Sequence, residues 1–135
     1  MAKILIFDTD ILIDYLLGIA DAKTFFASFT RTERYTTAIS LMEVYRGARD
    51  KRELNIFKRF FLAGFAEVLY INESASKKAT ELIEVYTLSH GLLLADGLIA
   101  AMALLYGGQL VTGNSRHFDY IPSLSLLVPP YRIKP

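Results

Sequence analysis

Three acidic residues, Asp8, Glu43 and Asp96, stand near the ends of expected elements of regular structure. Asp8 follows the apolar run KILIF, and Glu43 and Asp96 come early in segments with helical periodicity. Brought into one pocket, they would repel one another by about 4 kcal/mol per pair at roughly 4 Å and an effective dielectric near 20. A multivalent cation removes that repulsion, and oxygen ligands suit Mg²⁺ or Mn²⁺. The residues therefore predict hydrolysis of a phosphate ester by metal-activated water.

Each of the three acids also has an ordinary structural explanation. Asp8 could be a turn residue, although an unpaired charge at the end of a buried strand is costly. Ser40 followed three residues later by Glu43 matches a capping box, and Asp96 could cap the helix that it opens. The presence of all three acids together favours a shared pocket. Residues that follow the strands of a parallel sheet lie at the edge of the sheet where ligands bind.

Two further aspartates follow Asp8 closely. Asp10 is expected to be the N-cap of a helix over Ile11–Leu17, and Asp14 to lie on the solvated face of that helix. Asp8 and Asp10 also fit a haloacid-dehalogenase-type phosphatase, with Asp8 as nucleophile and Asp10 as acid or base. That alternative needs a downstream lysine and a late acidic pair, whereas the chain after Thr112 holds only one acid and one lysine.

Short apolar runs alternate with helical patterns along the chain. This alternation predicts an α/β fold, a three-layer α/β/α sandwich with a central, mainly parallel sheet. Gly91 and Gly107 are each expected to end a helix. The expected strands are KILIF, RYTTAI, EVLYI, QLVT and LSLLV, and the expected helices cover residues 11–17, 21–30, 40–50, 51–65, 74–90 and 96–106.

The composition predicts a single globular domain spanning residues 1–135, because 53% of residues are hydrophobic and no low-complexity tract interrupts them. Cysteine is absent and histidine is scarce, so a metal site would have to use oxygen ligands. A membrane span over residues 91–111 is disfavoured by the charge of Asp96 and by the Gly107–Gly108 pair. Since the N-terminus lacks a signal-peptide pattern, we expect a cytoplasmic protein.

Four motifs in this order resemble the PIN domain family and, within it, the VapC toxins of toxin–antitoxin pairs. They are FDTDILIDYL, the S-x-x-E-x-x-x-G pattern in SLMEVYRGA, LLLADGLIAAMAL, and the T-x-N-x-x-x-F pattern in LVTGNSRHF. The resemblance implies that Asp8, Glu43 and Asp96 bind metal and, with Thr112 and Asn114, form the catalytic site. Asn114 stands where many PIN nucleases have a fourth acid.

The same resemblance implies an endoribonuclease that depends on Mg²⁺ (or Mn²⁺) and cleaves structured RNA, tRNA or rRNA. It also implies a homodimer and a VapB-type antitoxin that inhibits the enzyme. A housekeeping RNA-processing nuclease is the alternative within the family. A binding module without catalysis is a further alternative, which the three retained acids disfavour.

Basic residues cluster directly after Glu43. The segment 46–59 holds six lysines or arginines against two acids, although the net charge of the chain is only +1. This surface could engage RNA phosphates, with Arg46 and Arg49 as candidates. It could equally be a solvated helical face with internal ion pairs.

The last motif adds Arg116 as a third candidate for RNA binding. His117, its neighbour, could contact RNA or assist proton transfer. Packing beside Phe118 is the favoured expectation, because histidine is commonly half-buried.

The helix over residues 51–65 has two apolar stripes. One stripe can face the core of the monomer, and the other then needs a partner surface, either a second copy of the chain or an antitoxin. The stripes are Leu54, Phe57 and Phe61, and Ile56, Phe60 and Gly64.

Overall fold

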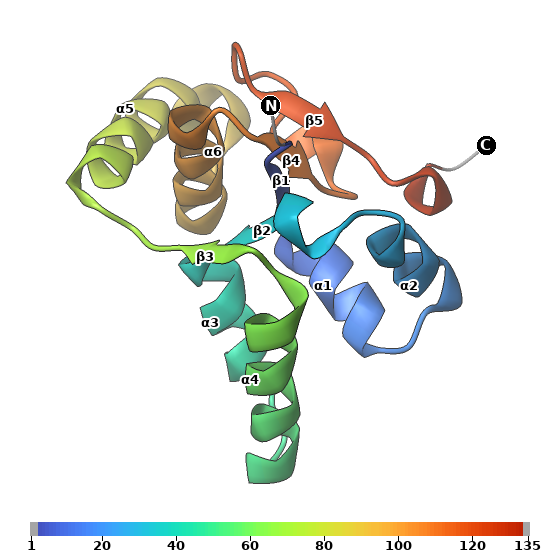
Figure 1. Ribbon diagram of the computed structural model, residues 1–135. Coiled ribbons are helices and arrows are strands. Elements are labelled where there is room, and N and C mark those ends of the chain that lie inside the picture. Colours follow the sequence, from blue (N-terminus) through green and yellow to red (C-terminus); the bar gives the residue numbers. More distant parts are fainter. Residues whose placement is uncertain (1–2, 134–135) are drawn as a thin grey trace.

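The computed structural model describes residues 3–133 and contains a five-stranded sheet flanked by helices (Figure 1). The strand order is β3-β2-β1-β4-β5, and every neighbouring pair is parallel. Each strand falls within a segment for which a strand is predicted. The strands are β1 (Leu5–Phe7), β2 (Arg34–Thr37), β3 (Glu67–Leu69), β4 (Gln109–Val111) and β5 (Ser125–Leu127).

Six α-helices cover the two faces of the sheet within residues 3–133. Ile6 packs with the layer that contains α5 and α6, whereas Leu5 and Phe7 pack with the opposite layer, because side chains alternate along a strand. The predicted three-layer α/β/α sandwich is therefore confirmed. The helices are α1 (Thr9–Leu16), α2 (Ala20–Ala27), α3 (Ala38–Arg46), α4 (Lys51–Gly64), α5 (Glu73–His90) and α6 (Leu94–Tyr106).

The direction of winding changes between β1 and β4. From β1 the chain continues to β2 and β3 on one side, and it later returns to β4 and β5 on the other. In open parallel sheets a ligand-binding crevice forms at the carboxyl ends of the strands at this point. Asp8 and Thr112 directly follow β1 and β4, and the register pairs Phe7 with Val111. The two polar residues are therefore neighbours at the crevice.

Helices α5 and α6 end as the glycines predict. Gly91 and Gly107 both have φ of 65°, a left-handed conformation that glycine adopts without a steric penalty. Helix α6 is largely buried against α5 and the sheet. None of the helices in the described part of the chain is both long and apolar enough to cross a membrane.

The packing of helix α4 differs from the expectation for its two apolar stripes. Its two apolar stripes were expected to serve the core and a partner separately, but both contribute to the same core. Phe61 is buried, and Phe60 is partly buried because its ring stacks on Tyr15 of α1 with centroids 4.9 Å apart. The reason is that aromatic side chains of α1 and α2 pack against the second stripe of α4, and Phe26 is one of them.

Candidate active site

Asp8 begins the site at the carboxyl end of β1. Its backbone N–H continues the sheet by donating to the Val111 carbonyl at 2.9 Å. Asp8 is only 6% exposed, and its carboxylate accepts two hydrogen bonds, from the Thr9 N–H and from the Thr112 hydroxyl, both at 2.8 Å. Asp8 is therefore the N-cap of α1, a structural role that leaves its carboxylate within the crevice.

The pKa of the Asp8 carboxyl is raised by its surroundings. Burial raises the pKa of its carboxyl to about 7, and the charges of Asp10 and Asp96 contribute to this rise. The hydrogen bonds from Thr112 and Thr9 oppose the rise without cancelling it. The ionised form of Asp8 is therefore costly in this fold, chiefly because the carboxyl is buried.

Asp10 is not the N-cap that was expected, because α1 begins two residues earlier, after Asp8. One carboxylate oxygen of Asp10 accepts from the Ile11 N–H at 2.9 Å, and the other accepts from the Gly113 N–H at 2.8 Å. A Cβ at position 113 would lie 2.7 Å from that second oxygen, so the contact requires glycine. Asp10 thus holds the loop that follows β4.

Asp14 also differs from expectation, because it is 7% exposed rather than solvated. Its carboxylate accepts from the Tyr131 hydroxyl at 2.8 Å and from Arg132 Nε at 2.7 Å. Both partners belong to the C-terminal 3₁₀ turn Pro130–Arg132, which the helical pattern around Asp14 gives no means of finding. Arg132 also approaches Asp10, with Nη1 3.8 Å from Oδ2.

Glu43 is supplied by α3, which begins directly after β2. Thr37 is the N-cap of this helix and accepts from the Ser40 N–H at 3.2 Å, so the predicted capping box of Ser40 and Glu43 is wrong. Glu43 instead accepts from the Thr9 hydroxyl at 2.7 Å. Because Thr9 adjoins Asp8, this bond directs Glu43 toward the crevice. Sequence reasoning missed Thr9, whose only signal was its place inside the D-T-D run.

Asp96 lies in the first turn of α6, and Leu93 rather than Asp96 is the N-cap. Burial raises the pKa of Asp96, a nearby His117 lowers it, and the charges of Glu43 and Asp10 raise it. His117 Nδ1 is 3.3 Å from Asp96 Oδ2, and the histidine side chain is 53% exposed. His117 lies beside Phe118 as expected, with ring centroids 6.4 Å apart, but its imidazole also faces Asp96 and is largely open to solvent.

The remaining motif residues follow β4. Thr112 is buried, and its hydroxyl joins two parts of the site by donating to Asp8 and accepting from the Asn114 N–H at 3.1 Å. Asn114 is exposed, and the 3₁₀ turn Ser115–His117 begins directly after it. Arg116 of that turn lines a cavity next to Asp96. Of the other RNA-binding candidates, Arg46 is exposed at the end of α3.

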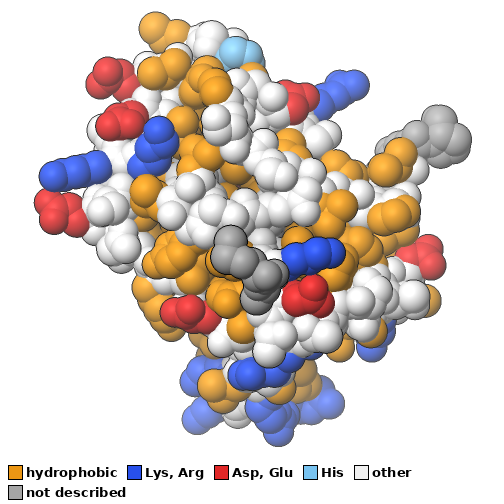
Figure 2. All heavy atoms as spheres, turned by 45° about the horizontal axis from the view of Figure 1, so that its top comes forward, with side chains coloured by type: hydrophobic (Ala, Val, Ile, Leu, Met, Phe, Trp, Pro, Cys, Tyr) orange, Lys and Arg blue, Asp and Glu red, His pale blue; other side chains and the backbone are white. Residues whose placement is uncertain are grey.

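Arg49 is not free to bind phosphate, because it forms an ion pair within its own segment. Its Nη2 donates to Glu53 one helical turn away at 2.8 Å. Basic side chains nevertheless gather at the end of the molecule formed by the start of α4 (Figure 2). The expected basic surface is thus present, with internal pairing at Arg49.

Oxygen donors of the type that Mg²⁺ or Mn²⁺ prefers surround the crevice. As the side chains stand, residues 3–133 contain no group of three His, Asp or Glu side chains close enough together to hold a metal ion. Asp96 is nevertheless within electrostatic range of Asp8, Asp10 and Glu43. The chemistry of the donor set fits a divalent cation, and binding one would require the carboxylates to move closer together.

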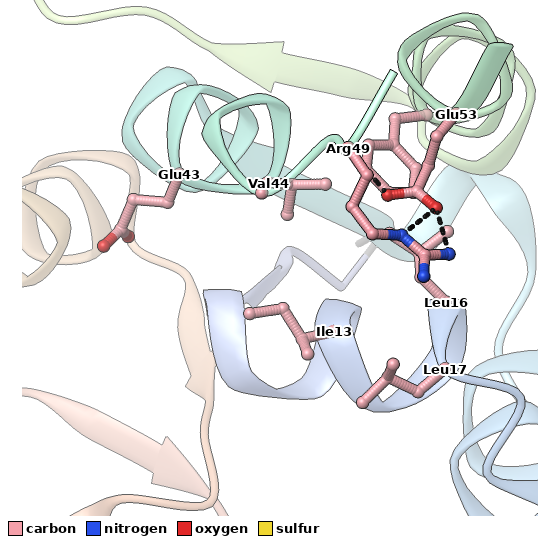
Figure 3. A pocket seen from close by; sticks show the side chains of 9 residues that line it. Ile13, Leu16, Leu17, Glu43, Val44, Arg49 and Glu53 are labelled. Carbon is pink, nitrogen blue, oxygen red and sulfur yellow. Dashed lines mark hydrogen bonds and ion pairs between the residues drawn. The ribbon is translucent and has the colours of Figure 1, made fainter. Parts of the chain in front are cut away.

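A groove of about 560 Å³ runs from Glu43 between α1, α3 and α4 (Figure 3). Ile13 and Leu17 of α1 form one wall, and the Arg49–Glu53 pair lies across the groove from them. The groove is mainly apolar apart from its charged ends. The groove therefore joins the apolar surface of α1 to Glu43, a residue of the candidate site.

Comparisons with known proteins identify the family of the chain. The PIN domain family matches residues 5–123. The chain therefore belongs to the PIN domain family and, within it, to the VapC-type proteins, as the following relatives indicate. Ribonuclease VapC19 of Mycobacterium tuberculosis is 32% identical over 127 residues, which are 92% of this chain and 97% of that protein. Ribonuclease VapC10 of the same organism is 30% identical over 128 residues, 93% of this chain and 92% of that protein.

A solved toxin–antitoxin complex from Klebsiella pneumoniae contains a chain with the same fold, with a TM-score of 0.76 and 29% identity. The match covers 93% of the present chain and 97% of that one. The family resemblance that the four motifs carry is confirmed.

Proposed function

We propose that the protein is a divalent-metal-dependent endoribonuclease and the toxin of a VapBC-type toxin–antitoxin pair. Structured RNA, tRNA or rRNA, is the proposed substrate. The PIN domain match and the two relatives, both named as ribonucleases, support a nuclease over a haloacid-dehalogenase-type phosphatase. The observation that carries the proposal is the buried carboxylate of Asp8, which accepts from the Thr112 hydroxyl at 2.8 Å at the switch point of the sheet, within electrostatic range of Asp10 and Asp96.

Asp8, Glu43 and Asp96 would hold Mg²⁺ or Mn²⁺, with Thr112 and Asn114 completing the site. The ion, when bound, supplies a water of lowered pKa and an electrophile for the scissile phosphate. The protein's own groups orient the acids: the Thr112 hydroxyl fixes one oxygen of Asp8, and the Thr9 hydroxyl fixes Glu43. His117, whose Nδ1 is 3.3 Å from Asp96 Oδ2, would assist proton transfer.

The antitoxin is proposed to occupy the groove between α1, α3 and α4. An apolar segment of the partner would cover Ile13 and Leu17, and a basic tip would reach Glu43 at the end of the groove. Arginine or lysine at that tip would pair with the acids and compete with the cation. Inhibition should therefore weaken as Mg²⁺ concentration is raised.

A homodimer is also proposed. The surface of α5 and α6, on the side away from the link between them, exposes large apolar side chains that a second copy could cover. Sedimentation equilibrium of the purified chain measures the oligomeric state directly, and a monomer at micromolar concentration would refute the dimer. The exposed side chains are Val85 of α5 and Leu105 of α6, which line one surface hollow.

The nuclease proposal is tested by assaying cleavage of total tRNA and rRNA with Mg²⁺ and with a chelator. We expect cleavage only with the cation, and loss of at least about a hundredfold in Asp96→Asn, because one charged ligand is removed. Asp119→Asn, an exposed acid on the turn after His117, is the matched control and should cleave normally. Full activity of Asp96→Asn would contradict the proposal.

The toxin role is tested by inducing the wild-type chain in cells and purifying what it binds. Arrested growth, reversed by a co-purifying small partner, is the expected result. Harmless induction of an active enzyme without any partner would support a housekeeping RNA-processing nuclease instead.

A further inference from the structure

A second cavity, of about 210 Å³, opens beside Asp96. The end of α5, the start of α6 and the turn after Asn114 form its walls. Its size lies below the roughly 300–1,000 Å³ of drug-sized ligand pockets, so it suits a single flat ring with its attached group. Among the described residues that line it, the polar ones are His90, Asp96, Arg116, His117 and Tyr120.

Two aromatic rings form a platform in this cavity. The rings of His90 and Tyr120 are stacked, with centroids 3.9 Å apart and planes inclined by 17°. Tyr86 meets His90 edge-on at 5.7 Å and supports the stack from within the helix. His90 is exposed, so the platform is open to solvent. An exposed, rigid aromatic surface of this kind is what proteins use to stack unpaired bases.

The charges of the cavity suit a nucleotide as well. Asp96 is its one acid among the described lining residues, and His117 faces that carboxylate at 3.3 Å. Arg116 on the same turn is exposed, and within residues 3–133 no carboxylate lies close enough to form an ion pair with it. A phosphate entering the cavity would therefore meet a guanidinium, which binds phosphate strongly.

The cavity adjoins the candidate site, because Asp96 lines the cavity and also belongs to that site. A nucleotide held here would be a near neighbour of the scissile phosphate. We propose that the cavity is a subsite for one unpaired nucleotide of the RNA substrate, whose base stacks on the His90–Tyr120 pair and whose phosphate faces Arg116. This inference rests on the proposed ribonuclease function and adds a structural requirement for the substrate, an unpaired base beside the cleavage site.

The test uses single-stranded RNA hexamers that carry a 5′-fluorescein and one abasic residue at each position in turn. Binding is measured by anisotropy to the full chain with Asp8→Asn, which is expected to bind but not cleave. One position should be sensitive, with affinity falling about 5- to 150-fold, since a stacked base contributes about 1–3 kcal/mol. In His90→Ala on the same background that position should lose its sensitivity, because the two changes remove the same contact.

Further variants separate the subsite from general effects. Tyr120→Phe keeps the ring and should behave as the parent, whereas Tyr120→Leu should behave as His90→Ala. Arg116→Ala should weaken binding of every hexamer and reduce the slope of log affinity against log salt by about 0.7. Lys77→Ala is the matched control, because this exposed lysine lies on the same helix about 20 Å from His90 and should change nothing.

The outcomes distinguish this inference from the function on which it rests. RNA cleavage by the wild-type chain, with equal sensitivity to the abasic residue in the parent and in His90→Ala, overturns the subsite alone. The same conclusion follows if no position is sensitive. Failure of the wild-type chain to bind or cleave any RNA overturns the proposed function and the subsite together.

Discussion

Arg132 Nε donates to Asp14 Oδ2 at 2.7 Å across 118 residues of chain. The same guanidinium reaches toward Asp10, whose carboxylate accepts from the Gly113 N–H. The C-terminal turn therefore braces α1 and, through Asp10, the loop that carries Thr112. A residue far from the motifs holds part of the site in place.

Replacing Arg132 by methionine should destabilise the protein by about 2 kcal/mol, because the buried Asp14 carboxylate loses its charged partner while Arg132 itself is partly solvated. Arg132→Lys should recover only part of this loss, since lysine lacks the planar fork. Urea unfolding followed by circular dichroism measures the change. Arg49→Met, which breaks an exposed ion pair, is the control and should unfold like the wild type; equal effects at the two positions would contradict the brace.

The stability of the metal-free protein should fall as pH rises from about 4 to about 7. The pKa of Asp8 is raised from 3.8 to about 7 in the fold, so the folded state binds more protons than the unfolded state in this range. Asp8→Asn should match the wild type near pH 4 and be more stable at pH 8, by at most about 4 kcal/mol at 1.36 kcal/mol per pKa unit. Denaturant unfolding at both pH values measures this; a variant that is less stable than wild type at pH 8 would refute it.

Much of the fold could be predicted because its signals are local. The apolar run of β1 is buried on both faces, and the alternation of strands and helices fixes a parallel sheet with helices on each side. The acids of the site were predicted for a related reason. Asp8 is the N-cap of α1, Asp96 lies in the first turn of α6, and Glu43 lies on α3, the helix that follows β2.

The contacts that a local pattern cannot reveal were missed or misjudged. In the run D-T-D both aspartates can cap a helix. In the structure Asp8 is the N-cap, and Asp10 accepts a hydrogen bond from the Gly113 N–H instead. The burial of Asp14 depends on a turn near the other end of the chain. His117 lies beside Phe118 as expected, but its sequence position does not show that α6 also brings Asp96 against it.

Thr112→Val should raise the pKa of Asp8 further, because the hydroxyl donates to the ionised carboxylate. The expected increase is about one unit, given the value of a hydrogen bond to a charged group. Carboxyl ¹³C chemical shifts, recorded against pH without divalent cations, report the titration of Asp8. Thr112→Ser keeps the donor and should titrate as the wild type; an unchanged midpoint in Thr112→Val would show that the bond does not stabilise the anion.

Leu17→Lys should weaken binding of the co-purifying antitoxin at least about tenfold, because Leu17 lines the groove and is 74% exposed. Leu62→Lys provides a matched control, since Leu62 is 77% exposed but is not part of the groove lining. Both variants should retain nuclease activity, which shows that they are folded. Titration calorimetry with the purified partner gives the dissociation constants, and equal weakening by the two substitutions would place the partner elsewhere.

Asp8, Glu43 and Asp96 are proposed to bind the catalytic cation together. Anomalous diffraction from a crystal soaked in Mn²⁺ locates such an ion without reference to activity. We predict one strong anomalous peak in contact with carboxylate oxygens of these three residues, at about 2.0–2.2 Å by analogy with Mg²⁺ coordination. Absence of a peak there at saturating Mn²⁺, or a peak only at other surface acids, would contradict the account.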